Sequence, residues 1–298
     1  MAGSRPALRV ATRGSALARL QTDAVARRLG LDVEVVVVQT TGDRRADVPI
    51  HTLGGTGVFV KEVEDAVLRG DADLAVHSAK DLPSTTAPGL VLAAVPERAD
   101  PRDAVVGSTL DTLPAGALVA TGSVRRRAQL ANLRPDLTFA ELRGNIGTRL
   151  DKAAGFDAVV IAAAALDRLS AADRIGERLD PALVLPQVGQ GALAVECRAD
   201  DDTTRALLAS IDDPAAHAAV DAERAFLERL GGGCNLPCGA LATLAGPSIA
   251  IEAVLATLDG RVLVRARATG TDATAAGREV ASRLLDEHGG RALLEDVA

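Results

Sequence analysis

A chain of 298 residues is long enough to form two or three hydrophobic cores. Its formal net charge of -7 and its lack of Trp and Tyr argue against a nucleic-acid partner. The longest apolar run, residues 158–166, is too short to span a membrane, so we expect no membrane partner. The N-terminus has no apolar stretch of signal-peptide length, and three cysteines are too few for a disulfide framework. We therefore expect a cytoplasmic protein with reduced thiols.

A repeated pattern occupies the first half of the chain. VATRGSALARLQ at 10–21 and VATGSVRRRAQL at 119–130 each predict a strand, a turn and a helix that begins after a serine. A helix, a glycine stop and an apolar strand then follow in both places, at 58–77 and at 146–161. Two matching pairs in the same order favour a duplication over two unrelated α/β segments.

The repeat predicts two α/β lobes, each with a mainly parallel sheet flanked by helices. Lobe 1 comprises residues 1–96 with 192–210, and lobe 2 comprises residues 100–187. Two stretches join the lobes, and the second, ending at residue 197, reads as a strand that returns to lobe 1. Ligands of such sheets bind beyond the carboxyl ends of the strands, in a cleft that can open and close.

The pattern changes after residue 213. Residues 214–298 predict a small α+β domain, with a helix at 217–230, three apolar strands and a last helix at 273–288. Its first helix leads into a glycine-rich loop. Such a run of glycines offers neighbouring side chains nothing to pack on, so we expect something to approach its backbone closely.

That loop, LGGGCNLPCG at residues 230–239, holds two of the three cysteines. Cys234 and Cys238 do not predict a metal site, because there is no second pair and no nearby histidine to complete tetrahedral zinc. Cys197, in an apolar strand, is most simply a buried thiol. What remains is a loop thiol able to carry a group covalently, since a thiolate is a strong nucleophile. The residues alone do not say which group.

Arginines are concentrated between residues 121 and 149, where six face only two acids. TGSVRRR joins a helix N-terminus, which favours anions, to guanidinium groups that bind carboxylates bidentately. The alternative is a solvated helix face with weak surface ion pairs, which we favour for Arg127 and Arg134. We favour ligand binding for the arginines at strand-to-helix turns, which are Arg13, Arg125, Arg126, Arg143 and Arg149. The implied ligand carries several carboxylates.

HSAKDLP at residues 77–83 ends an apolar strand with reactive side chains. Asp81 could act as an acid or base, or accept a substrate N–H, while Lys80 would supply positive charge. The motif is short, and a capping Asp before a proline turn is an equally good interpretation. We interpret His77 as a core or supporting residue.

Taken together, these residues resemble the porphobilinogen deaminase family along essentially the whole chain. The matching stretches, in order, are ATRGSALA, GGTGVFVKEVE, DLAVHSAKDLP, DPRDA, TGSVRRRAQL, LRGNIGTRL, LPQVGQGALAVECR, ERAFLERL and GGCNLP. The resemblance implies two lobes like those of type II periplasmic binding proteins, plus the small α+β domain. It also implies a cytoplasmic, deaminating transferase of tetrapyrrole and haem biosynthesis. Such an enzyme joins four porphobilinogen molecules head to tail into hydroxymethylbilane and releases ammonia.

The resemblance also assigns site residues. It implies a dipyrromethane cofactor attached to Cys234 by a thioether, and Asp81 as the catalytic carboxylate with Lys80 beside it. Cys238 replaces the usual aliphatic residue, which leaves attachment there as a weaker alternative. The positions that match substrate and cofactor carboxylate binders are Arg13, Ser15, Ser78, Lys80, Thr121, Ser123, Arg125, Arg126, Arg143, Arg149 and Arg168.

The expected partners are porphobilinogen and the growing pyrrole chain, with the enzyme a monomer and no metal or nucleotide. The alternative from another class is a non-catalytic two-lobed binding protein for an organic anion. That alternative explains the repeat and the arginines. It leaves the third domain and Cys234 unexplained.

Overall fold

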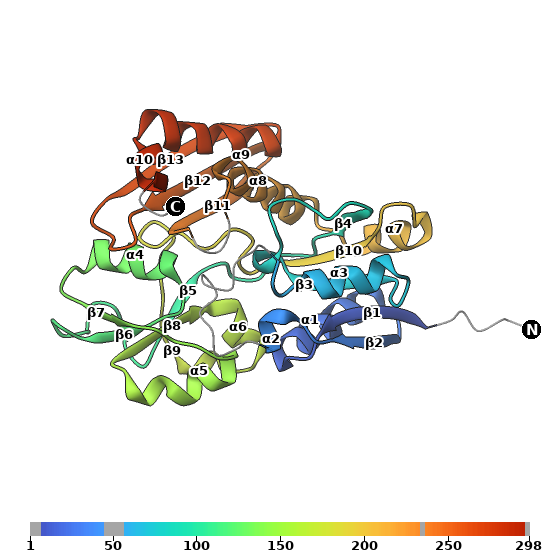
Figure 1. Ribbon diagram of the computed structural model, residues 1–298, viewed down its shortest axis with the longest axis horizontal. Helices are drawn as coiled ribbons and strands as arrows, with labels where there is room; N and C mark the ends of the chain where they lie inside the picture. The colour runs from blue at the N-terminus through green and yellow to red at the C-terminus, as the bar shows by residue number, and fades with distance from the viewer. Residues whose placement is uncertain (1–6, 45–56, 233–235, 296–298) are drawn as a thin grey trace, which may run out of the picture.

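The computed structural model describes residues 7–44, 57–232 and 236–295 (Figure 1). Cys234, the predicted attachment residue, lies outside the described residues. Figure 1 shows lobe 1, in blue and cyan, beside lobe 2, in green, with a C-terminal unit in orange and red above both. The predicted fold class, two α/β lobes with a small α+β unit, is confirmed. The exact domain boundaries stay predictions.

Lobe 1 has a five-stranded sheet in the order β2-β1-β3-β10-β4. β1 runs parallel to β2 and β3, whereas β10 runs antiparallel to β3 and β4. The strands are β1 (Leu8–Arg13), β2 (Val33–Val38), β3 (Leu74–Ser78), β4 (Leu90–Ala94) and β10 (Leu193–Arg198). The helices are α1 (Ala16–Leu29), α2 (Thr41–Arg44), α3 (Lys61–Leu68) and α7 (Asp202–Leu208).

Lobe 2 repeats this topology with the order β7-β6-β8-β5-β9. β6 runs parallel to β7 and β8, and β5 runs antiparallel to β8 and β9. The strands are β5 (Asp103–Val106), β6 (Leu118–Ala120), β7 (Thr138–Ala140), β8 (Ala158–Ala162) and β9 (Ile175–Arg178). The helices are α4 (Val124–Leu133), α5 (Ile146–Lys152) and α6 (Ala163–Arg168). The shared order supports the duplication.

The expectation of mainly parallel sheets is confirmed, because four of the five strands in each sheet run in the same direction and only β10 in lobe 1 and β5 in lobe 2 are reversed. Each sheet has two parallel and two antiparallel pairings. Both antiparallel pairings in each sheet involve the exchanged strand: β5 enters lobe 2 from lobe 1, and β10 returns to lobe 1, so neither arrives through a helical crossover that would make it parallel. The predicted returning strand itself is confirmed.

The C-terminal unit packs helices on one antiparallel sheet. The sheet has the order β11-β12-β13, formed by β11 (Cys238–Ala245), β12 (Ser248–Ala256) and β13 (Leu263–Gly270). The helices are α8 (Pro214–Leu230), α9 (Ala273–Ser282), a π-helical turn at Arg283–Glu287 and α10 (Gly290–Glu295). Phe226, Ile251 and Leu284 lie in the core between the layers. A side chain at Gly277 would collide with the Ala222 carbonyl, so glycine lets α9 approach α8 closely.

His77, the first residue of the HSAKD motif, lies in a buried polar cluster. The Nε2 atom of His77 on β3 is 3.3 Å from Glu196 Oε2 on β10, and both side chains are buried. Burial and the charge of Glu196 raise the pKa of Glu64 on α3 to about 7. The interpretation of His77 as a buried residue is confirmed.

No helix in the described part of the chain is long and apolar enough to cross a membrane.

Candidate active site

The three units meet around one pocket. Lobe 1 contributes Lys80, lobe 2 contributes Ser123 and Arg125, and the C-terminal unit contributes Leu236 and Cys238. The loops that follow β3 and β6 therefore face one another, as expected for the carboxyl ends of strands in facing lobes. Cys238 begins β11, four residues after Cys234 in the sequence.

Lys80 and Asp81 lie in a single turn of 3-10 helix, Ala79–Asp81, at the end of β3. The second connection between the lobes braces this turn, because Gln187 Nε2 donates to the Lys80 carbonyl over 3.2 Å. Gly189 approaches so closely that a side chain there would collide with the backbone of Ala79. Burial and the positive charge of Arg126 lower the pKa of Lys80 to about 8. The positive charge of Arg126 in lobe 2 therefore acts on Lys80 in lobe 1.

Asp81 is partly open to solvent, with 29% of its side chain exposed. Arg13 ends β1, and its Nη1 atom is 3.8 Å from Asp81 Oδ2. The structure thus brings together the carboxylate and one of the predicted arginines. Ser78, also predicted, ends β3 just before the turn.

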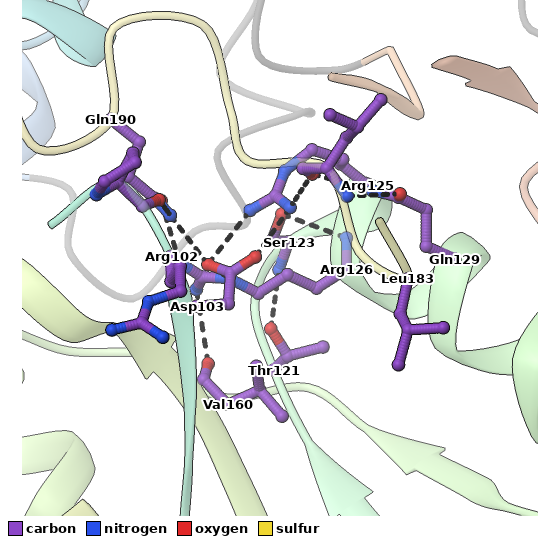
Figure 2. Close-up of polar contacts among 12 residues, drawn as sticks. Arg102, Asp103, Thr121, Ser123, Arg125, Arg126, Gln129, Val160, Leu183 and Gln190 are labelled. Carbon is purple, nitrogen blue, oxygen red and sulfur yellow. Dashed lines mark hydrogen bonds and ion pairs between the residues drawn. The ribbon is translucent and has the colours of Figure 1, made fainter. Parts of the chain in front are cut away.

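Arg125 and Arg126 converge on one buried carboxylate, Asp103 (Figure 2). Asp103 Oδ2 lies 2.7 Å from Arg125 Nη1, and Asp103 Oδ1 lies 2.8 Å from Arg126 Nε. Gln190 Nε2 donates to the same carboxylate over 2.9 Å. Burial alone would raise the pKa of Asp103, but the two guanidinium groups outweigh it and hold that pKa well below its usual range. Contact of these arginines with a ligand stays a prediction.

Sequence reasoning missed Asp103 as the partner of these arginines. The available signal was the DPRDA stretch, which places an aspartate on β5 directly after the crossing between the lobes. Arg125 also donates to the Leu185 carbonyl over 2.6 Å, and Arg126 to the Val160 carbonyl over 3.2 Å. Together these bonds fix the start of α4 on the sheet of lobe 2.

Arg149 joins the same charged region from α5. Burial and the charges of Arg126 and Arg143 lower the pKa of Arg149 to about 10, while Asp81 is among the acids that oppose this shift. Its Nε donates to the Gly144 carbonyl over 2.8 Å. The positive charges of Arg126 and Arg149 also lower the pKa of Lys80. We call the four residues linked in this way the cationic group: Lys80, Arg126, Arg143 and Arg149. Such an excess of positive charge favours a ligand with several carboxylates.

The remaining predicted binders have other contacts. Ser15 caps α1, because its Oγ atom accepts a hydrogen bond from Ala18 N over 3.2 Å. Ser123 caps α4 in the same way, with its Oγ atom accepting from Arg126 N over 3.4 Å. The Ser123 N–H in turn donates to Thr121 Oγ1 over 3.3 Å. Arg168 donates to the Gly191 carbonyl over 2.7 Å. Burial and then Arg28 lower the pKa of Arg168, so the charges that act on it are not those of the cationic group.

Two family models match this chain. The model "Porphobilinogen deaminase, dipyromethane cofactor binding domain" matches residues 8–206, and "Porphobilinogen deaminase, C-terminal domain" matches residues 217–286. The chain belongs to the porphobilinogen deaminase family. The residues matched by the cofactor-domain model, 8–206, include both lobes and therefore every predicted carboxylate binder from Arg13 to Arg168.

Curated porphobilinogen deaminases are similar along nearly the whole chain. The protein of Acidothermus cellulolyticus is 49% identical over 292 residues, covering 93% of this chain and 88% of its own. That of Roseiflexus castenholzii is 50% identical over 302 residues, covering 97% and 99%. Among solved structures, the GluR0 ligand-binding core from Nostoc punctiforme in complex with (L)-glutamate is 16% identical with a TM-score of 0.35, covering 68% of this chain and 91% of that chain.

Proposed function

We propose that this chain is a hydroxymethylbilane synthase. It joins four porphobilinogen molecules head to tail through new C–C bonds and releases one ammonia from each, in tetrapyrrole biosynthesis. The observation that carries the proposal is the meeting of Asp81 with cationic side chains of both lobes, in a member of the porphobilinogen deaminase family. No described feature favours a non-catalytic anion-binding protein, and the matched C-terminal domain sets the chain apart from that alternative.

The described residues fit the family's dipyrromethane cofactor. Each of its two pyrrole rings carries an acetate and a propionate, so the group brings four carboxylates into the cleft. Burial is the first cause of the lowered pKa values of Lys80 and Arg149, and the positive charge of Arg126 lowers both further, so carboxylates bound beside these side chains would oppose both effects. We propose that Cys234 holds the cofactor by a thioether and that the binders named from the sequence hold its carboxylates. Once bound, the cofactor supplies the ring carbon to which the first substrate is joined.

Asp81 is the proposed catalytic carboxylate. A carboxylate accepts hydrogen bonds but donates none, so it suits the pyrrole N–H of porphobilinogen. The aminomethyl group is protonated when its C–N bond breaks, so the bonding electron pair leaves with the nitrogen as neutral ammonia and the positive charge passes to the ring and its methylene carbon. The fixed negative charge of Asp81 stabilises that charge where it forms.

Lys80 and the arginines are the proposed carboxylate binders. Charge-assisted hydrogen bonds of this kind contribute about 1.5 to 3 kcal/mol each, enough to hold a chain that gains two carboxylates per step. Because the pKa of Lys80 is about 8, its side chain is mostly charged at neutral pH. Its binding of a carboxylate weakens as the pH rises through that value, because the side chain then loses its positive charge.

We also propose the finer assignments that follow from the sequence. The enzyme acts as a cytoplasmic monomer, without a nucleic-acid or membrane partner. Its units are residues 1–96 with 192–210, residues 100–187, and residues 214–298. The net charge of -7 and the small anionic substrate support the absence of a nucleic-acid partner.

A turnover assay tests the proposed function. The purified holoprotein, incubated with porphobilinogen, is expected to release four molecules of ammonia for each hydroxymethylbilane formed. Product and ammonia are measured in the same sample. Binding of porphobilinogen without ammonia release would contradict the proposal and favour the two-lobed binding protein.

A further inference from the structure

Arg13 is held on two sides by residues of lobe 1. Its Nε atom donates to Asp43 Oδ2 over 3.2 Å, and its Nη2 atom donates to Asp43 Oδ1. The guanidinium carbon also lies 4.2 Å from the centroid of the Phe59 ring. One edge and one face of the guanidinium are therefore occupied, and its Nη1 atom is the one directed toward Asp81.

Asp43 is itself fixed in place. Thr40 Oγ1 donates to Asp43 Oδ2 over 2.7 Å, and the Asp43 N–H donates to Thr40 Oγ1 over 3.3 Å. Burial would raise the pKa of Asp43, but the bonds and charge from Arg13 and the bonds from Thr40 lower it overall. Asp43 is thus a charged, anchored acceptor and a competitor of Asp81 for the same guanidinium.

This competition has a consequence for Asp81. An arginine beside a single carboxylate tends to form a bidentate pair, and such a pair would occupy the acceptor sites that Asp81 offers to a pyrrole N–H. Here the bidentate edge faces Asp43, and Asp81 receives only the 3.8 Å approach of Nη1. Because the guanidinium is planar and rigid, fixing one edge fixes the direction of the other.

We propose that Asp43 is a positioning residue for the reaction. By holding the Nε–Nη2 edge of Arg13, it keeps Arg13 beside Asp81 without letting it close onto that carboxylate. The inference rests on the proposed function, since it assigns Asp81 the part described there. It adds a residue that acts only through Arg13.

The test is a double-mutant cycle on the holoenzyme. Asp43→Asn keeps the size of the side chain but removes its charge, so Arg13 is expected to pair with Asp81. We expect kcat for porphobilinogen to fall by about 10- to 100-fold with KM within about threefold. In an Arg13→Gln background, Asp43→Asn is expected to change kcat by less than about twofold, because the residue through which it acts is gone.

A matched control comes from the same strand. Arg9, also on β1, is held bidentately by Asp73, whose side chain is 22% exposed, close to the 25% of Asp43. Asp73→Asn is expected to leave kcat unchanged. Asp43→Glu, which keeps the charge, is expected to recover most of the lost kcat, whereas a role in packing alone predicts that the longer side chain does worse than Asn.

The outcomes separate this inference from the proposed function. If the wild-type holoprotein converts porphobilinogen and Asp43→Asn matches it, the positioning role is wrong and the function stands. Losses that add in the Arg13→Gln background would also overturn the positioning role. If the wild-type holoprotein releases no ammonia, the proposed function fails and this inference fails with it.

Discussion

Asp81→Asn is expected to lower the rate of ammonia release by about 10²- to 10³-fold, the usual cost of removing one group that stabilises developing charge. Asparagine keeps the size of the side chain and one acceptor oxygen, but it has no negative charge to offer the ring as the amine leaves. The fold should persist, because the side chain is 29% exposed and Arg13, whose Nη1 atom lies 3.8 Å from it, stays bound to Asp43. Single-turnover ammonia release and thermal unfolding measure the two effects separately.

The control for Asp81→Asn is Asp71→Asn. Asp71 forms an exposed pair with Arg69 in lobe 1, and its side chain is 52% exposed. This variant should release ammonia at the wild-type rate. Turnover by a folded Asp81→Asn variant within a few-fold of wild type would refute the catalytic assignment.

Asp103→Ala is expected to destabilise the protein by about 3 to 5 kcal/mol. The substitution leaves the guanidinium groups of Arg125 and Arg126 buried without the carboxylate that now balances them. It also removes an acceptor from Gln190, so the connection between the lobes loses a contact. Denaturant unfolding of wild type and variant measures the free energy directly.

An exposed pair provides the comparison for Asp103→Ala. Asp202 pairs with Arg205 on α7, but its side chain is 91% exposed, so Asp202→Ala should leave stability unchanged. A loss below about 1 kcal/mol for Asp103→Ala would show that the network in Figure 2 does not carry the stability assigned to it.

Local patterns predicted the elements of this fold well. The serines before α1 and α4 are helix caps, and α8 ends at Gly231 in the left-handed conformation, as its glycine run indicates. The repeated order of strands and helices correctly predicted two lobes, because periodicity and capping depend on neighbours in sequence. The sheets are mainly parallel, as predicted, but the one reversed strand in each, β10 or β5, results from strand exchange between the lobes, which depends on the whole chain.

The site was predictable in its residue types but not in its pairings. The sequence predicts Arg125 and Arg126 as ligand binders, and their guanidinium groups meet Asp103, which lies 22 and 23 residues away in sequence. Asp43, the partner of Arg13, has no local motif at all. Such pairs form only when distant strands and helices assemble, so spacing along the chain does not predict them.

The measurement that tests the central claim most directly is the intact mass of the protein purified from cells that make porphobilinogen. The wild-type chain and Cys238→Ser are expected to exceed the mass of their sequences by two pyrrole units, and Cys234→Ser is expected to match its bare sequence. A bare mass for the wild-type chain, or an increment that survives in Cys234→Ser and disappears in Cys238→Ser, would contradict it.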